Sequence, residues 1–430
     1  MAAASDIACP VVAATPTRGA HFFGFHDVTP WAPANDRLAV LRVDPTLRRL
    51  PDGDDVAEVC VWRPDAGSVE AVGETRAWNF QMGARVQWLP DGRLIWNTLE
   101  KGRLGAEILD TESGVRRRLD FAVGAISPDG SEAVGPHFGR LARHWPAYGV
   151  AGAVAPGVDM PAPAEDGLWH LDLQSGAVRL LLSIADVTAF RRRSTPAEIP
   201  HFVTHPLYSP SGTRIAFIHR FLTADGSTYS RLLVCGRDGG DLTLLAEEKV
   251  SHFCWRDDDT LLVWCRRMPA ALAAARRHGL LALPLVRPVL RRLRALSGGA
   301  KQRLANEHYF LIGVDPSSPR RVVGAGTLPV DGHPMFAADR RHFVTDTYPD
   351  SDGLQQLMIC DCETGARIDI GRFLADAAVG EGDIKCDLHP RWDRSSRMVC
   401  VDTSRAGIRQ CAIVDAAPAL AAAESDDDGC

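Results

Sequence analysis

Short apolar runs bounded by turn residues follow one another along almost the whole chain. One pattern recurs: a polar head that often contains histidine, an aromatic residue, a turn such as Pro-Asp-Gly, and a β-branched or apolar strand. The seven copies of this pattern begin at His26, Gln81, Val123, His201, Val250, Asp331 and Lys385. Further strand-like segments closed by turns lie between the copies, so each unit supplies about four strands.

These repeats predict an all-β fold, a seven-bladed β-propeller. Closure of the blades into a ring is favoured because it removes exposed sheet edges. We expect the propeller to span residues 21–415, after an N-terminal extension of residues 1–20. A pair of β-sandwiches is the alternative architecture. Because the copy at Val123 is the weakest, a six- or eight-bladed ring also stays open.

Two segments depart from the repeat. Residues 266–305 are rich in Ala, Leu and Arg, contain prolines and lack carboxylates, which predicts a basic helical insertion within the propeller. Such a segment could lie on an anionic membrane surface, or it could form a solvated lid against the propeller rim or a neighbouring subunit. The tail, residues 416–430, ends in ESDDDGC and is expected to be disordered and acidic.

The composition narrows the class of protein. With 46% hydrophobic and 24% charged residues, the chain can bury a large core. Its net charge of −6 argues against a nucleic-acid partner, because binders of the phosphate backbone usually carry a basic surplus. The N-terminus lacks a basic, then apolar, export signal, so a cytoplasmic protein is expected, with peripheral attachment at the inner membrane through residues 266–305 as the alternative. Eleven cysteines without a CxxC pair predict reduced core thiols.

The histidines suggest where the chemistry lies. Five of the fourteen occupy similar places, just before the aromatic residue and turn of a repeat: His26, His205, His252, His333 and His389. In a propeller, the innermost strand of each blade begins beside the axis, so these positions should converge at one end of the channel. Their polar neighbours are Asp27, Gln81, Arg85, Asp331, Lys385 and Arg391. Neutral histidines with a carboxylate such as Asp387 suit Mn²⁺, Fe²⁺ or Zn²⁺, and a histidine left uncoordinated can act as a general base.

Several of these motifs resemble a known family. The runs THPLYSPSGTRIAF, SHFCW, DGHPMF and DLHPRW resemble the blade heads of the oligogalacturonate lyases, seven-bladed propellers that cleave uronate oligomers in the cytoplasm by β-elimination using Mn²⁺. The runs GFHDVTPW, WNFQMGARVQWLP, AISPDGSEAVG and TDTYPD resemble a lyase-related branch associated with bacterial surface-polysaccharide clusters. The resemblance covers nearly the whole chain outside the basic insertion. It implies a carbohydrate partner and a divalent metal cofactor, with Mn²⁺ the expected ion.

The resemblance also implies roles for individual residues. By position, His205 matches the catalytic histidine of the family, and His252 and His389 match two metal-binding histidines. Asp387 stands where the family has a further metal-binding histidine and can itself coordinate a hard divalent ion. Ile384 stands roughly where the family has a metal-binding glutamine, and the catalytic arginine has no clear match. The resemblance therefore does not establish pectic oligomers as the substrate.

A mechanism follows for a uronate substrate. The metal would bind the sugar carboxylate and make the C5 proton more acidic, and His205 would take that proton. The predicted catalytic residues are His205, Arg220 and Arg391, with the arginines pairing with the sugar carboxylate. The predicted substrate-binding residues are His26, Asp27, Gln81, Arg85, Arg231 and His333.

Two other functions stay open. The same site could hydrolyse a glycosidic bond through two acids such as Asp27 and Asp387. A non-catalytic propeller could instead bind a glycan or organise enzymes of polysaccharide assembly at the membrane, because the fold alone does not choose a function. The sequence leaves the oligomeric state undetermined.

Overall fold

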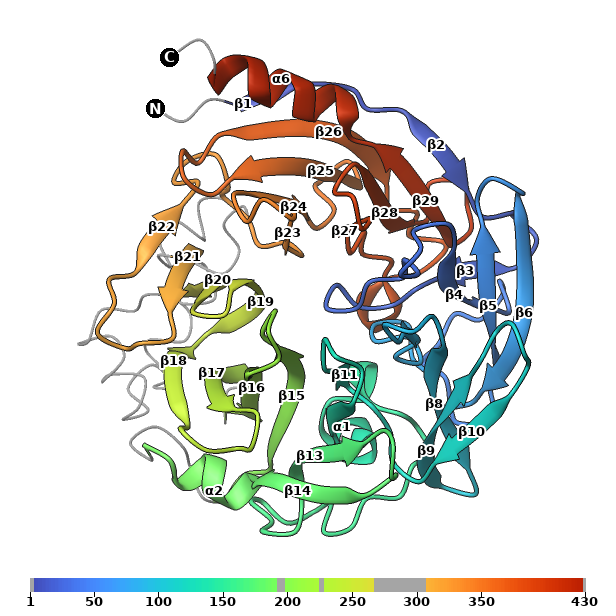
Figure 1. Ribbon diagram of the computed structural model, residues 1–430, viewed down its shortest axis with the longest axis vertical. Helices are drawn as coiled ribbons and strands as arrows, with labels where there is room; N and C mark the ends of the chain where they lie inside the picture. The colour runs from blue at the N-terminus through green and yellow to red at the C-terminus, as the bar shows by residue number, and fades with distance from the viewer. Residues whose placement is uncertain (1–3, 192–197, 224–227, 267–306, 428–430) are drawn as a thin grey trace, which may run out of the picture.

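The computed structural model describes residues 4–191, 198–223, 228–266 and 307–427. Its strands form seven separate sheets arranged around one axis, as Figure 1 shows. The seven-bladed propeller predicted from the repeats is therefore confirmed. The predicted basic insertion, residues 266–305, lies outside the described residues apart from its first position.

Six of the seven blades are antiparallel sheets of four strands, and one blade has five strands. The first three blades consist of β3 (Ala20–Phe22), β4 (Leu38–Val43), β5 (Ala57–Arg63) and β6 (Ser68–Thr75); β7 (Gln87–Trp88), β8 (Leu94–Glu100), β9 (Arg103–Leu109) and β10 (Arg116–Leu119); and β11 (Ala125–Ile126), β12 (Glu132–Pro136), β13 (Gly167–Asp172) and β14 (Val178–Ser183). The next two consist of β15 (His201–Tyr208), β16 (Arg214–Leu222), β17 (Thr228–Gly236) and β18 (Thr243–Glu248); and β19 (Val250–Asp257), β20 (Thr260–Arg266), β21 (Glu307–Gly313) and β22 (Arg321–Val323).

The last two blades recruit strands from the N-terminus. They consist of β23 (Met335–Phe336), β24 (His342–Asp346), β25 (Leu354–Asp361) and β26 (Arg367–Leu374), followed by β1 (Ala4–Asp6); and of β27 (Arg391–Trp392), β28 (Met398–Thr403) and β29 (Gln410–Asp415), followed by β2 (Val11–Ala14). β1 pairs in parallel with β26, and β2 pairs antiparallel with β29. The prediction that residues 1–20 form an extension before the propeller is therefore wrong for β1 and β2, which belong to its sheets. Their strands cover the outer edges of two blades, which would otherwise present unpaired backbone groups.

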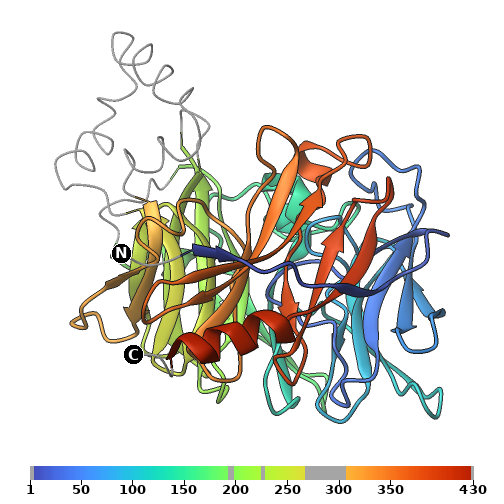
Figure 2. The same ribbon diagram turned by 90° about the horizontal axis from the view of Figure 1, so that it is seen from above.

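Among the described residues, the helices lie in connections and at the C-terminus: α1 (Phe138–His144), η1 (Pro146–Tyr148), α2 (Ile184–Ala189), η4 (Gly382–Ile384) and α6 (Ala417–Asp427). The predicted disordered tail, residues 416–430, begins instead with α6. Its Ala-rich sequence favours a helix, and Ala416 and Ala419 are fully buried in the cluster that also includes Ile7 and Cys9. α6, β1 and β2 lie together on the outside of the last two blades (Figures 1 and 2).

The core is distributed between neighbouring blades. Large side chains such as Trp62, Trp96, Trp264 and Trp392 are almost completely buried in these layers. All ten described cysteines are free thiols, and nine of them are buried, in agreement with the predicted core thiols. Within the described part of the chain, no helix is long and apolar enough to cross a membrane.

One connection matters for the site. Residues 137–166, between β12 and β13 of the third blade, leave the sheet and carry α1 and η1. α1 contacts β15, the innermost strand of the next blade. The connection thereby brings its side chains to β15, the strand that carries His201 and His205.

Candidate functional site

Five histidine rings surround the side chain of Phe25. The distances between the ring centroid of Phe25 and those of the five histidines are 4.4 Å for His26, 4.6 Å for His205, 5.2 Å for His389, 6.2 Å for His252 and 6.4 Å for His333. All five imidazoles are buried. The structure thus brings together the five blade-head histidines that the repeat pattern singled out. Phe25, at their centre, was not predicted, although it directly precedes His26.

At two of these five histidines the backbone adopts a strained conformation that sets the direction of the imidazole. His205 and His389 have φ angles of 54° and 45°, in the left-handed region, and each precedes a proline. Non-glycine residues in such conformations cost about 1–3 kcal/mol each and persist only where the surrounding structure holds them. The pairing of β15 with β16 also shifts register between Thr204 and Leu207, a bulge centred on His205. Bulges re-aim side chains, and here the bulge carries the imidazole that contacts Phe25.

Oxygen atoms hold the Nδ1 atoms of three of the imidazoles. His333 Nδ1 lies 2.8 Å from a carboxylate oxygen of Asp346, and His252 Nδ1 lies 3.0 Å from one of Asp331. His389 Nδ1 lies 2.6 Å from the Gly24 carbonyl oxygen. Because a carbonyl oxygen can only accept a hydrogen bond, His389 must donate from Nδ1. Nε2 of the neutral ring then carries a lone pair that can bind a metal. Histidines that bind metals are typically oriented in this manner.

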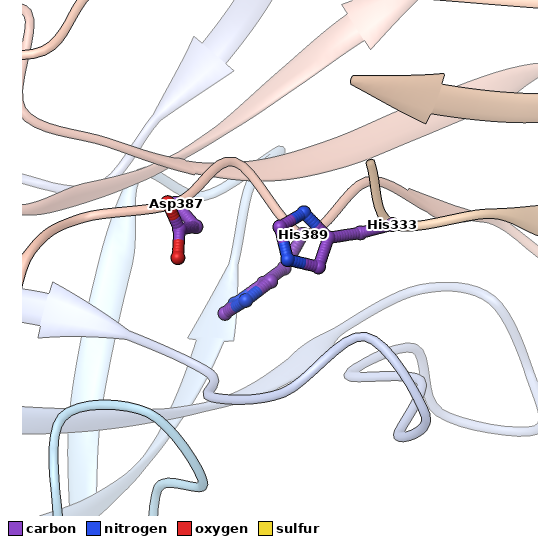
Figure 3. Close-up of side chains that lie close together, drawn as sticks. All are labelled: His333, Asp387 and His389. Atoms are coloured by element: carbon purple, nitrogen blue, oxygen red, sulfur yellow. The ribbon is translucent and has the colours of Figure 1, made fainter. Parts of the chain in front are cut away.

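A candidate metal centre lies where two of these histidines meet a carboxylate. Ligand atoms of His333, Asp387 and His389 all lie within 4.8 Å of one another (Figure 3). His389 Nε2 and Asp387 Oδ1 are buried and have no hydrogen-bond partner among the described residues. The other Asp387 oxygen pairs with Lys385 Nζ at 3.0 Å. Leaving a buried acceptor unsatisfied costs about 1–3 kcal/mol. A divalent cation bound between these two acceptor atoms would satisfy both.

This set differs from the predicted one by one residue. The resemblance implied His252, Asp387 and His389 as ligands, whereas the compact set contains His333 in place of His252. The ring of His252 remains next to that of His333, with 4.4 Å between their centroids. The repeat pattern placed both histidines at blade heads, but it could not tell which blade faces Asp387.

Burial sets the protonation of the cluster. It lowers the pKa values of His26, His205, His333 and His389 well below the usual value for histidine, and neighbouring histidines and arginines lower them further. For His205, the charge of Arg220 is the largest contribution after burial. These imidazoles are therefore neutral near pH 7, the form that a metal ligand or a general base requires. Burial also raises the pKa of Asp387, against the opposing effect of Lys385.

Asp27 and Arg85, predicted to bind substrate, bind each other. Arg85 Nη1 and Nη2 donate to the two Asp27 oxygens at 2.6 and 3.1 Å, and Nη2 and Nε also donate to the Gly124 carbonyl oxygen. Both side chains are nearly fully buried. The geometry thus supports a structural ion pair that ties the first three blades together. Gln81 donates to the Lys385 carbonyl oxygen at 3.4 Å and so supports the loop that carries Asp387.

Arg220 and Arg391 place two fixed cations beside the histidines. Arg220 donates to Ser230 Oγ at 3.1 Å and to the Val250 carbonyl oxygen at 3.2 Å, and its guanidinium lies 4.4 Å from the ring centroid of Trp145. Arg391 donates to the carbonyl oxygens of Pro390 and Pro334. Neither has an ion-pair partner in the part of the chain that the structure describes. Burial lowers the pKa of each guanidinium to about 10, which leaves both charged.

Arg231, by contrast, lies elsewhere than predicted. It donates to the carbonyl oxygens of Val187 and Phe190 at 3.1 and 2.6 Å, at the end of α2. A guanidinium there satisfies carbonyl groups that a helix leaves unpaired at its C-terminus. The geometry gives Arg231 a structural role in the fourth blade.

Sequence reasoning missed an aromatic wall around the cluster. Trp145 and Tyr148, from the connection of residues 137–166, stack with 3.8 Å between their ring centroids. The Tyr148 ring lies 5.5 Å from that of His205. The ring centroid of Tyr348 lies 5.5 Å from that of His333, and Lys385 Nζ lies 3.9 Å from the Tyr348 ring centroid. Tyr348 belongs to the TDTYPD run, which was the one available signal.

The fold and this arrangement can be compared with known proteins. The crystal structure of an oligogalacturonate lyase from Vibrio parahaemolyticus aligns with a TM-score of 0.60 at 12% identity, covering 94% of this chain and 92% of that chain. An oligogalacturonate lyase in complex with manganese aligns with a TM-score of 0.59 at 13% identity, covering 96% of this chain and 98% of that one. No protein-family model and no curated protein matches the sequence. The chain therefore shares the seven-bladed propeller fold of the oligogalacturonate lyases.

Proposed function

We propose that this propeller is a metal-assisted lyase that cleaves a uronate-containing oligosaccharide or polysaccharide by β-elimination. The observation that carries the proposal is the neutral His205 beside Arg220, in the same ring of histidines around Phe25 as His333 and His389 of a cluster of metal-ligand type. The fold shared with oligogalacturonate lyases, one of which is described in complex with manganese, supports the same class of reaction.

The proposed metal ligands are His333, Asp387 and His389, with His252 as a further ligand from the adjacent head. Their nitrogen and oxygen atoms suit Mn²⁺. A divalent ion held there would withdraw charge from the sugar carboxylate and make the neighbouring C5 proton more acidic. Asp346 and the Gly24 carbonyl oxygen keep His333 and His389 in the orientation that such binding needs.

His205 is the proposed general base. Its Nδ1 lies 2.8 Å from Thr204 Oγ1, and when Nδ1 donates to that hydroxyl oxygen, Nε2 is left free to accept a proton. Its lowered pKa keeps it neutral and ready to accept. Arg220 and Arg391 are the proposed partners of the sugar carboxylate, because each carries a buried positive charge without a described carboxylate.

Glycoside hydrolysis through Asp27 and Asp387 has less support. Arg85 engages both oxygens of Asp27, so this carboxylate is not placed to activate water or to protonate a leaving group. Asp387 pairs with Lys385. A binding-only role has no observation that favours it and is one outcome of the test below.

The test combines metal analysis with turnover. We expect protein purified without chelator to contain a stoichiometric divalent metal and to form unsaturated uronate products, detected by absorbance, from at least one member of a panel of uronate oligosaccharides. His205→Ala should lower turnover by about 10²- to 10⁴-fold and retain the metal, because general-base catalysis contributes about that factor. His342→Ala, a histidine paired with Asp339 outside the cluster, is the matched control and should retain activity. Binding of the glycans by wild type with no turnover would favour a non-catalytic propeller.

A further inference from the structure

Two tyrosine hydroxyls at the site have no assigned role. Tyr148 and Tyr348 contact different histidines of the cluster, and neither hydroxyl makes a hydrogen bond to another group in the described ranges. Tyr148 lies against His205, with 5.5 Å between ring centroids, whereas Tyr348 lies against His333 and His252. Both tyrosines are half-buried, which leaves their free hydroxyls available to hydrogen-bond a substrate at the site.

A β-elimination requires two proton transfers. A base removes the proton from C5, and the oxygen that leaves C4 must gain a proton, because a sugar alkoxide is a poor leaving group. His205 accounts for the first transfer only. We propose, resting on the function proposed above, that Tyr148 is the general acid that protonates the leaving glycosidic oxygen.

The geometry distinguishes Tyr148 from Tyr348. C4 and C5 are bonded to each other, so the acid and the base must reach neighbouring atoms of one sugar ring. Tyr148 contacts His205, while the contacts of Tyr348 are with His252, His333 and Lys385. Of the two tyrosines, Tyr148 is therefore the one that lies beside the base.

The surroundings hold Tyr148 in place and protonated. Its ring stacks on Trp145, whose other contacts include the guanidinium of Arg220. The next residue, Gly149, is anchored through its carbonyl oxygen by Asn79 Nδ2 at 2.8 Å. Burial raises the pKa of Tyr148 far above neutrality, so the hydroxyl carries a proton to donate.

The proposed step is balanced in atoms and electrons. The C5–H bond breaks and its proton moves to His205 Nε2, while its electron pair forms the C4–C5 double bond. The C4–O4 bond breaks with its electron pair on O4, and O4 takes the proton of the Tyr148 hydroxyl. His205 then releases its proton to water and the tyrosinate regains one from water, which restores both residues.

The test replaces only the hydroxyl, in Tyr148→Phe, and compares two leaving groups. One substrate is a uronate oligosaccharide with a sugar leaving group at C4, and the other carries 4-nitrophenoxide at C4, which leaves without a proton. We expect elimination of the sugar to slow by about 10²- to 10⁴-fold and elimination of nitrophenoxide to change by less than about tenfold. Exchange of the C5 proton with deuterium from solvent should persist, which would also report that the site is assembled.

Tyr208→Phe is the matched control, since the Tyr208 hydroxyl donates to Glu132, which contacts none of the five blade-head histidines. This variant should behave as wild type with both substrates. Equal slowing of both substrates by Tyr148→Phe, or no slowing of either, would overturn the acid role while leaving the lyase proposal intact. Failure of the wild-type protein to form an unsaturated product from either substrate would instead overturn the lyase proposal, and the acid role with it.

Discussion

The protonation of single ring nitrogens decides what the histidine cluster can do. His389 must donate from Nδ1 to the Gly24 carbonyl oxygen, and His333 directs Nδ1 to Asp346. Gly24 can present its carbonyl oxygen there because it has a φ of 113°, which side chains rarely allow, and because a Cβ atom would lie 2.9 Å from the Met82 carbonyl oxygen. The orientation of one candidate ligand in the last blade thus depends on a glycine in the first.

Asp346 is the residue through which this orientation can be tested. Its carboxylate contacts both Nδ1 and the backbone N–H of His333. Asp346→Asn keeps the shape but weakens the acceptor, so we expect affinity for Mn²⁺ to fall by about 10- to 100-fold with little change in fold. Calorimetric titration of metal-free protein measures this. Asp339→Asn, which alters a pair with His342 outside the cluster, is the control, and an equal loss there would contradict the assignment.

Asp402 gives a prediction on pH. Its carboxyl accepts hydrogen bonds from the backbone N–H groups of Phe23 and Gly24, and burial raises its pKa from 3.8 to about 7. Between these pH values the folded state holds a proton that the unfolded state has lost. The stabilising effect of this proton is therefore complete below about pH 4 and is lost as the pH rises through about 7, a change of up to about 4 kcal/mol.

Asp402→Asn should remove this dependence. The free energy of unfolding, measured by urea titration at pH 5 and pH 8, should then fall less across this interval than in wild type. Glu381→Gln, at an exposed position, serves as the control for loss of a carboxylate. Equal pH dependence in wild type and Asp402→Asn would show that Asp402 is ionised in the folded state at both pH values.

At the scale of elements, the sequence predicted the site residues that occur at the same place in each repeat and missed those that lie in a single connection. His205, His252, His333 and His389 each stand three residues before an aromatic residue, so their common place could be derived from spacing. The choice of His333 as the neighbour of Asp387 depends on how adjacent blades are rotated about the axis, which spacing does not contain. Trp145 and Tyr148 lie in a connection that occurs once, so no repeat marked them.

That connection can be tested at Gly149. A Cβ atom at this position would lie 1.9 Å from the Ala142 backbone nitrogen, so Gly149→Ala must displace η1 from α1 and move Tyr148. We expect faster hydrogen exchange over residues 138–150 and lower turnover, while most of the propeller keeps its protection. Gly114→Ala is the control, because Gly114 has a φ of 73° but a Cβ there meets nothing within 4 Å. It should cost about 1 kcal/mol or less and leave turnover unchanged.

At the scale of the whole molecule, the ring depends on strands from opposite ends of the sequence. β2 supplies the outermost strand of the blade that ends with β29, yet almost 400 residues separate them in pairs such as Ala14 and Ala412. A four-residue apolar run near the N-terminus gave no sign of so distant a partner, which is why it was predicted to lie outside the propeller. Closure of the ring also affects the site, because the carbonyl oxygen of Gly24 in the first blade accepts the hydrogen bond that orients His389 in the last blade.

Removal of residues 1–14 tests this closure. The truncated chain loses β1 and β2 and exposes the edge of β29, so we expect unfolding to require about 2–4 kcal/mol less free energy, since each of the several hydrogen bonds lost contributes about 0.5–1.5 kcal/mol. Affinity for Mn²⁺ should fall as well, because the last blade positions His389. Exposed edges also pair with one another, so light scattering should detect self-association. Val12→Lys is the control, because it changes a side chain of β2 that is 53% exposed while the strand itself stays in place. If the truncated protein kept the wild-type urea midpoint and metal affinity, the blade that holds Asp387 and His389 would be stable without its fourth strand, and closure would have no effect on the site.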